Sequence, residues 1–255
     1  MTKKRYKKPN NTGKNHIIFG LHAVKAALLN NKRVHEELLI TENNQKMKDN
    51  YKAKIKKITI LNQKDFNKLY GGEKSTQGIV LKTNDFERPN LQQFLKNENL
   101  NDRSVLLALD QITDPQNIGS IMRSCALFNC RGILVAKDNA PDLTPSIYKA
   151  ASGAAEIVNY FRVTNLKRSI SELKKYGYWV YGFDSSDHKS SKLNFSKKSI
   201  LIFGSEGKGM RDLVKKECDE IIKLKIQSNK HFLIDSLNVS NAASIGLYEF
   251  FKSEL

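Results

Sequence analysis

The chain has 255 residues, and its 43 lysines and arginines against 26 aspartates and glutamates give a formal net charge of +17. This length can build one large domain or two modest ones, and no apolar run is long enough for a membrane span or a secretory signal. The charge favours nucleic acid as a partner, because each neutralised phosphate releases counterions, although a solvated lysine-rich surface would give the same count. The three cysteines have neither metal-ligand nor disulfide spacing, so we expect a protein of the reducing cytoplasm.

The first part of the chain predicts a basic tail and a small α/β unit. Residues 1–15 carry six basic residues and no acidic residue, which predicts a disordered tail. The pattern of residues 16–83 predicts, in order, a helix over 17–31, strands over 37–41 and 57–61, a helix over 63–72 and a strand over 76–83. The next stretch is polar, contains Pro89 and has little periodicity, so we expect a linker over 84–102.

The remaining residues, 103–255, alternate regularly between apolar runs and amphipathic segments. Strands are expected over 104–110, 132–136, 157–163, 178–184, 198–204 and 220–226. Helices are expected over 115–129, 144–156, 165–177, 210–219 and 237–252. Alternation of this kind predicts an α/β domain in which helices cover both faces of a mostly parallel sheet.

A glycine-rich turn follows the strand over 198–204, in the stretch ILIFGSEGKGM. The turn is not a Walker A loop, because Met210 stands where that motif needs lysine. It is not a dinucleotide fingerprint either, because Asp212 stands where the third glycine belongs. Glu206 places a negative charge in the turn, which suits a cation or a hydrogen-bonding partner better than a phosphate. Taken alone, the turn fits an ordinary strand-to-helix connection or a site for another ligand.

Two further stretches carry polar residues next to helix starts. In DPQNIGSIMRSC, Asn117 lies at a predicted helix start after Pro115, and Arg123 lies off the apolar stripe of that helix. In DSLNVSNAAS, Ser236 and Asn238 flank Leu237 before the last helix. A capping role for Ser236 or Asn238 is the simplest interpretation of that pattern, and an exposed arginine is usually only a surface residue.

In this order, DPQNIGSIMRSC, LIFGSEGKGM and SLNVSNAAS resemble the three motifs of the SpoU/TrmH group of RNA 2′-O-ribose methyltransferases, which belong to the SPOUT superfamily. The resemblance covers about residues 16–252. The stretches IIFGLHAVKAAL and STQGIVL are similar to the N-terminal substrate-binding domain of that group. Together with ASGAAE, they indicate the ribosomal-RNA branch.

The resemblance implies a C-terminal domain, 103–255, with a deep trefoil knot whose loops hold S-adenosylmethionine, and an RNA-binding domain over 16–83. It assigns cofactor contacts to Gly204, Gly209, Leu224, Ile226 and Leu237. It assigns contact with the RNA phosphate and with the nucleophile to Arg123, and positioning of substrate and cofactor to Asn117, Glu206, Ser236 and Asn238. It implies a homodimer and no metal ion. Arginine normally stays protonated, so alkoxide stabilisation suits Arg123 better than a general-base role.

We therefore expect transfer of a methyl group to a ribose 2′-hydroxyl of structured RNA, with a guanosine of large-subunit ribosomal RNA as the target. A transfer-RNA 2′-O-methyltransferase, a non-catalytic RNA-binding relative and a nucleotide-dependent enzyme that uses the Gly204 turn are the alternatives. The chain departs from the family pattern by having Lys225 in place of proline and a longer loop over 225–235. These departures bear on cofactor affinity.

Overall fold

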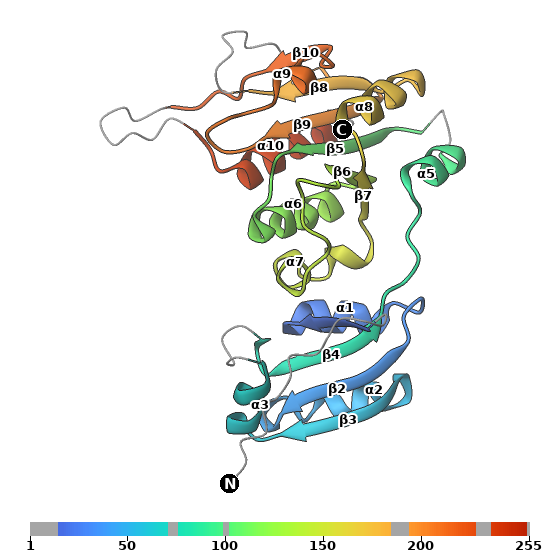
Figure 1. Ribbon diagram of the computed structural model, residues 1–255, viewed down its shortest axis with the longest axis vertical. Coiled ribbons are helices and arrows are strands. Elements are labelled where there is room, and N and C mark those ends of the chain that lie inside the picture. Colours follow the sequence, from blue (N-terminus) through green and yellow to red (C-terminus); the bar gives the residue numbers. More distant parts are fainter. Residues whose placement is uncertain (1–14, 71–75, 99–101, 185–193, 228–235, 254–255) are drawn as a thin grey trace. The chain divides into compact units, whose positions relative to one another are not determined.

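The computed structural model describes residues 15–70, 76–98, 102–184, 194–227 and 236–253 (Figure 1). The chain divides between Glu87 and Arg88 into two compact units, each of which has its own sheet. The tail predicted over 1–15 lies outside the described residues except for Asn15, as does most of the longer loop predicted over 225–235. None of the helices formed by the described residues has the length and apolar character needed to cross a bilayer.

The first unit is a four-stranded sheet with the strand order β1-β4-β2-β3. Its elements are β1 Asn15–Phe19, α1 Leu21–Leu29, β2 His35–Thr41, η1 Glu42–Asn44, α2 Met47–Tyr51, η2 Lys52–Lys54, β3 Ile55–Leu61, α3 Gln63–Tyr70 and β4 Ile79–Asn84. Strand β4 is antiparallel to both β1 and β2, whereas β2 and β3 are parallel. The parallel pair needs a crossover connection, which α2 and the two 3-10 turns supply.

The predicted helix over 17–31 was wrong in its first turn. Residues Ile17–Phe19 instead belong to strand β1, which pairs with β4, and helix α1 starts only at Leu21. Two β-branched residues and an aromatic residue suit a strand, and Gly20 reverses the chain with φ 93°. Gln77 lies two residues before β4, and its side chain accepts a hydrogen bond from the Leu21 backbone at 2.8 Å. This bond satisfies one of the backbone donors at the start of α1.

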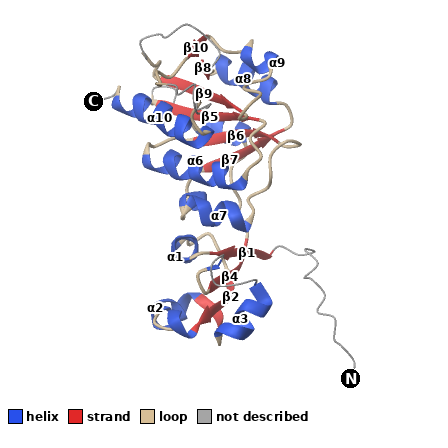
Figure 2. Cartoon of the chain, turned by 90° about the vertical axis from the view of Figure 1, so that its left-hand side faces the viewer, coloured by secondary structure: helices blue, strands red, loops and turns tan. Residues whose placement is uncertain are grey.

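The second unit is a six-stranded sheet with the strand order β10-β8-β9-β5-β6-β7, and every neighbouring pair is parallel. Its elements are α5 Leu91–Asn97, β5 Ser104–Asp110, α6 Pro115–Leu127, β6 Gly132–Ala136, α7 Pro145–Ala151, η3 Ala154–Glu156, β7 Asn159–Val163, α8 Leu166–Lys175, β8 Trp179–Phe183, β9 Lys198–Gly204, α9 Asp212–Lys215, β10 Glu220–Ile222 and α10 Val239–Lys252. Helices α6, α7 and α10 lie on one face of the sheet and α8 and α9 on the other (Figure 2). The parallel α/β prediction is confirmed.

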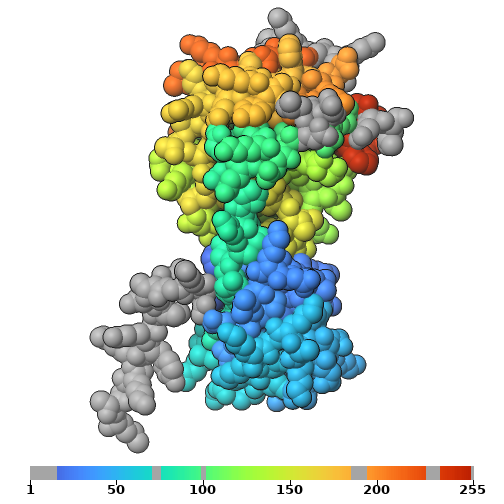
Figure 3. Space-filling view, turned by 90° about the vertical axis from the view of Figure 1, so that its right-hand side faces the viewer, coloured from blue at the N-terminus to red at the C-terminus, as the bar shows by residue number. Residues whose placement is uncertain are grey.

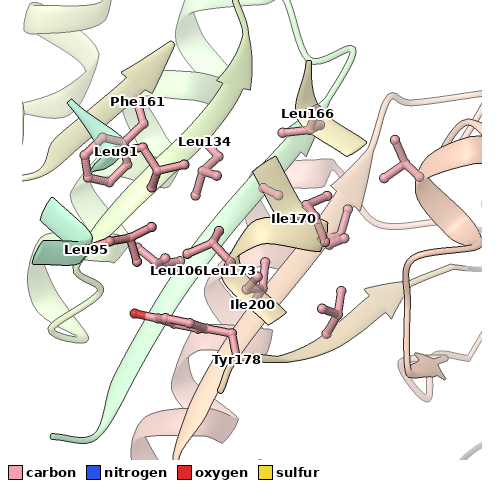
Figure 4. Packing of buried hydrophobic residues seen from close by; sticks show 14 of the residues in the cluster. Leu91, Leu95, Leu106, Leu134, Phe161, Leu166, Ile170, Leu173, Tyr178 and Ile200 are labelled. Carbon is pink, nitrogen blue, oxygen red and sulfur yellow. The ribbon is translucent and has the colours of Figure 1, made fainter. Parts of the chain in front are cut away.

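The linker expected over 84–102 contains helix α5, which sequence analysis missed. Asn90 and Gln93 form a capping box at its start. Leu91 and Leu95 are buried in the core of the second unit, and Figure 4 shows Leu91 beside Phe161. Gln92 also donates a hydrogen bond to Glu172 of α8, and this segment lies along the surface of the second unit in Figure 3. Only two turns of helix are present, too few for a periodic signal to stand out.

Elements of the second unit that differ most from the prediction include a divided helix and two short segments. The helix expected over 144–156 is split, because Ser152 and Gly153 both adopt left-handed backbone angles, with φ 51° and 100°. Helix α9 covers only Asp212–Lys215 and strand β10 only Glu220–Ile222. The strands predicted over 104–110, 132–136 and 198–204 are confirmed at both ends. The trefoil knot implied by the resemblance stays a prediction.

Candidate active site

The three motif stretches converge at the carboxyl edge of the second unit's sheet. Strands β5 and β9 are parallel neighbours, and their last residues, Asp110 and Gly204, are paired in register. Helix α6 starts a few residues after β5, and helix α10 packs against both α6 and β9. In parallel α/β sheets this edge is where the loops can build a ligand site.

The turn after β9 folds back on itself so tightly that its first residue has to be glycine. A Cβ atom at Gly204 would lie 2.0 Å from the carbonyl carbon of Gly209 and 2.2 Å from the backbone nitrogen of Met210. Ser205 and Gly209 exchange two backbone hydrogen bonds, of 3.2 and 2.9 Å, which close the turn. Gly207 and Gly209 take left-handed φ angles of 87° and 67°. The turn is therefore a closed backbone loop that presents the side chains of its middle residues.

Glu206 projects from this loop into a cluster of hydrogen-bond donors. Its Oε1 accepts from Nδ2 of Asn238 at 2.7 Å, from the Val239 backbone at 3.3 Å and from Nδ2 of Asn117 at 3.4 Å. Val239 is the first residue of α10, so the carboxylate also lies at the positive end of a 14-residue helix. The negative charge in the turn thus binds the starts of helices α6 and α10, which explains why the loop does not suit a phosphate.

Asn238 connects the three motifs through its side-chain amide. Its Nδ2 donates to Oδ1 of Asn117 at 3.0 Å as well as to Glu206. Its Oδ1 accepts from the backbone and from the hydroxyl of Ser240, at 2.9 and 2.6 Å. Because both donors bind the same oxygen, the amide orientation is defined. The predicted capping role of Asn238 is confirmed, and the residue holds the cluster together at the same time.

Ser240 is a site residue that sequence analysis missed. It is buried, and its hydroxyl fixes the Asn238 amide. A hydroxyl two residues after a capping asparagine is a weak signal in sequence, because most such serines bond only to nearby backbone. Farther along the same helices, the hydroxyls of Ser124 and Ser244 are 2.7 Å apart and join α6 to α10.

The structure does not bring Arg123 into contact with this cluster. The arginine lies on the exposed side of α6, and among the described residues it has no hydrogen bond or ion pair. Its charge is therefore available to a partner molecule. Ser236 is exposed just before Leu237 and Asn238, at the start of the described C-terminal segment.

Three of the residues assigned to cofactor contact are apolar and lie at the same edge. Leu237 is 36% exposed and is bonded in sequence to Asn238 of the cluster. Leu224 is half-buried and Ile226 is 39% exposed. Both follow β10, which is parallel to β8, so they leave the sheet at the edge where Gly204 ends β9. Apolar side chains with this exposure beside a polar loop can form the wall of a ligand site.

Chemically, the cluster is arranged to orient groups. Asn117 and Asn238 are neutral amides, and Oε1 of the Glu206 carboxylate accepts from three donors. Such an arrangement suits a reaction that depends on alignment of donor and acceptor, in which a separate cation stabilises developing negative charge.

Comparisons with known proteins agree with the family resemblance of the three motifs and with the division into two units. Residues 104–248 match the SpoU rRNA methylase family, and residues 17–89 match the family described as RNA 2′-O ribose methyltransferase substrate binding. The 23S rRNA (guanosine-2′-O-)-methyltransferase RlmB of Coxiella burnetii is 33% identical over 241 residues, which is 91% of this chain and 93% of that protein. YacO of Bacillus subtilis, named for the TrmH family of tRNA/rRNA methyltransferases, is 38% identical over 178 residues, or 69% of this chain and 70% of that protein.

A solved structure with a similar fold is the SpoU methyltransferase AviRb from Streptomyces viridochromogenes in complex with the cofactor AdoMet. It has a TM-score of 0.75 and 19% sequence identity, over 94% of this chain and 91% of that one. The fold and the motif cluster thus define a methyltransferase with an N-terminal substrate-binding domain. The chain belongs to the SpoU rRNA methylase family.

Proposed function

We propose that the protein transfers the methyl group of S-adenosylmethionine to a ribose 2′-hydroxyl in structured RNA, and that its target is a guanosine of large-subunit ribosomal RNA. The observation that carries this proposal is the hydrogen-bonded cluster of Asn117, Glu206 and Asn238, one residue from each family motif, at the carboxyl edge of the sheet. A nucleotide-dependent enzyme is disfavoured, because the Glu206 carboxylate of the turn already binds the backbone N–H of Val239 at the start of α10. That donor is therefore not free to bind a phosphate.

The residues at this edge fit the proposed cofactor. S-adenosylmethionine has an adenosine, an amino-acid group and a sulfonium, and carries no phosphate. An added Cβ at Gly207 or Gly209 would meet no atom within 4 Å, so a ligand can approach the backbone of the loop there, and the exposed apolar surface of Ile226 and Leu237 suits an adenine ring. The sulfonium supplies an activated methyl group when the cofactor is bound. Asn117, Glu206 and Asn238 then hold the loop and the two helix starts in place.

Arg123 is proposed to bind the RNA phosphate beside the target nucleotide and to stabilise the alkoxide that forms as the hydroxyl loses its proton. Its side chain is exposed and, within the described parts of the chain, unpaired, as this role requires. Arginine offers a planar set of donors that suits phosphate oxygens. Ser236 is proposed to help position the substrate at the start of α10.

Ribosomal RNA is favoured over transfer RNA by the first unit and by the similarity to RlmB. The match to a substrate-binding family covers residues 17–89, and the similarity to RlmB of Coxiella burnetii extends over both units. The net charge of +17 suits a large structured RNA. Because the bacterial relatives would meet ribosomal RNA in the cytoplasm, a cytoplasmic location follows from the proposal.

The proposal is tested with purified protein, radiolabelled S-adenosylmethionine, and transcripts of large-subunit ribosomal RNA and of transfer RNA. We expect label in the ribosomal transcript, at one position that nuclease mapping identifies. A second transcript with a 2′-deoxyribose at that position should accept no label, because the hydroxyl is the acceptor. Label that persists on the deoxy substrate would mean base methylation. Calorimetry that detects no cofactor binding would favour a non-catalytic RNA-binding relative.

We also propose that the protein works as a homodimer through the exposed side of α6 and α10. An apolar face is formed there by Leu127 and Phe128 at the end of α6 and by Ile245, Tyr248 and Phe251 of α10. Leu127 is 70% exposed and Tyr248 is 48% exposed, and Phe128, next to Leu127 in sequence, packs against the ring of Tyr248. Arg123 lies one helical turn before Leu127, so a second copy docked on this face would lie next to the proposed catalytic arginine.

The dimer prediction is tested with Leu127→Asp. We expect the dissociation constant of the dimer, measured by sedimentation, to rise by about a hundredfold or more, because the interface would then bury an unpaired charge. Leu213→Asp is a matched control, since Leu213 is 60% exposed on α9, which covers the other face of the sheet. Equal sedimentation of both variants and the unchanged protein would contradict the proposed interface.

A further inference from the structure

An ion pair between a buried carboxylate and a partly exposed arginine joins the end of β5 to the end of the Gly204 turn. Asp110 is the last residue of β5, and its side chain is completely buried. Its Oδ1 accepts from Nε of Arg211 at 2.8 Å and lies 2.6 Å from Nη2 of the same guanidinium. Its Oδ2 accepts from the backbone nitrogen of Arg211 at 2.8 Å. One carboxylate therefore binds both the side chain and the main chain of a single residue.

The position of this pair relates it to the active-site loop. Asp110 is paired in register with Gly204, where the loop leaves the sheet, and Arg211 immediately follows Met210, where the loop returns. The backbone bonds between Ser205 and Gly209 close the middle of the loop. The hydrogen bond from the Arg211 backbone to Asp110 fixes its far end to the strand. The two ends of the loop are thereby held against the same edge residue.

We propose that Asp110 is a positioning residue for the active site, which acts through Arg211 to hold the loop that carries Glu206. This inference rests on the proposed methyl transfer and adds a residue that the three-motif cluster does not contain. Asp110 itself is buried beneath the loop and contacts Arg211, not Glu206. Its effect reaches Asn117 and Asn238 because Glu206 is the acceptor shared by both.

The backbone next to Asp110 supports an anchoring role. Gln111 adopts a left-handed φ of 61°, which is uncommon for a residue that is not glycine. Such a conformation persists where the surroundings over-determine it. Asp110 thus contacts the loop that carries Glu206, and the next residue, Gln111, turns the chain from β5 toward the start of α6, where Asn117 lies. The loop with Glu206 and the segment with Asn117 therefore both start next to Asp110.

Asp110→Asn is the informative variant, because it keeps the shape of the side chain but places an amide donor against either the guanidinium or the backbone N–H of Arg211. We expect hydrogen exchange of the backbone amides of residues 205–211 to become at least about tenfold faster in the protein without cofactor. We expect weaker binding of S-adenosylhomocysteine in calorimetry and a loss of about 10- to 100-fold in kcat/KM for methyl transfer.

Arg211→Lys is the conservative variant. It keeps a positive charge and the backbone donor but loses the planar pair of contacts, so its exchange rates and kcat/KM should lie between those of Asp110→Asn and the unchanged protein. It also keeps the proposal testable if Asp110→Asn does not fold.

The control is an ion pair at the opposite edge of the same sheet, in which both side chains are buried. Glu98 lies 3.2 Å from Lys198, and the two side chains are 7% and 6% exposed. Glu98→Gln should lower the melting temperature while the exchange of residues 205–211, the affinity for S-adenosylhomocysteine and kcat/KM stay unchanged. This variant separates general stability from positioning of the loop.

The inference is overturned if Asp110→Asn and Arg211→Lys lower only the melting temperature, as Glu98→Gln does, while loop exchange and kcat remain within twofold of the unchanged protein. If instead the unchanged protein transfers no methyl group, the proposed function fails. The hydrogen-exchange comparison then still decides whether Asp110 holds the loop, because it needs neither cofactor nor RNA.

Discussion

Arg123→Ala is expected to lower kcat/KM for methyl transfer by about 10²- to 10³-fold while the protein stays folded. The side chain is exposed on α6 and contributes nothing to the buried stripe of that helix, so its removal should not disturb the core. What is lost is the cation proposed to bind the phosphate and to stabilise the alkoxide. Steady-state kinetics with the ribosomal transcript measure the effect, and circular dichroism verifies the fold.

Two comparisons make this result specific. Arg168→Ala removes another exposed arginine, from α8 on the other face of the sheet, and should change kcat/KM little. Arg123→Lys keeps the charge but loses the planar donor set, so partial activity is expected. Near-normal activity of Arg123→Ala would show that the role assigned to this residue is wrong.

Gly204→Ala is expected to have the largest effect on structure. The added methyl group would lie 2.0 Å from the Gly209 carbonyl carbon, and its three nearest neighbours are all backbone atoms, which cannot move aside as a flexible side chain would. We expect a loss of about 3 kcal/mol or more in the stability of the second unit, and no measurable binding of S-adenosylhomocysteine. Denaturant titration and calorimetry on the full chain measure the two effects.

Gly177→Ala provides the comparison for this prediction. Gly177 has a left-handed φ of 84°, but an added Cβ there would meet no atom within 4 Å. Its substitution should cost only the strain of the backbone, about 1 kcal/mol. If Gly204→Ala were no more destabilising than Gly177→Ala, the close return of the chain over Gly204 would not be what requires glycine.

The fold of the second unit was largely predictable because its central strands are continuous apolar runs bounded by polar residues. Strand β5 is buried at every position, and its predicted ends at Ser104 and Asp110 are confirmed. The errors arose where pairing partners outweigh local pattern. Strand β1 forms because residues 15–19 pair with β4, which is far along the chain. Helix α5 forms because Leu91 and Leu95 pack into the core of the second unit.

The site was predictable only through the family resemblance. The residues alone suggested a cap at Ser236 or Asn238 and an ordinary turn at Glu206. Their contacts span 89 residues between Asn117 and Glu206 and 121 residues between Asn117 and Asn238, and no local periodicity encodes such distances in sequence. Asp110 was missed for a related reason. An aspartate at the end of a strand does not indicate in sequence that it binds an arginine 101 residues later.

The sharing of one carboxylate oxygen by two helices has a consequence for how the site can move. Glu206 accepts from Asn238 and Val239 at the start of α10 and from Asn117 in the first turn of α6. A displacement of either helix start would therefore remove a donor from the carboxylate. We expect the turn and the two helix starts to shift together, so that a molecule bound against one of them is felt by the other two.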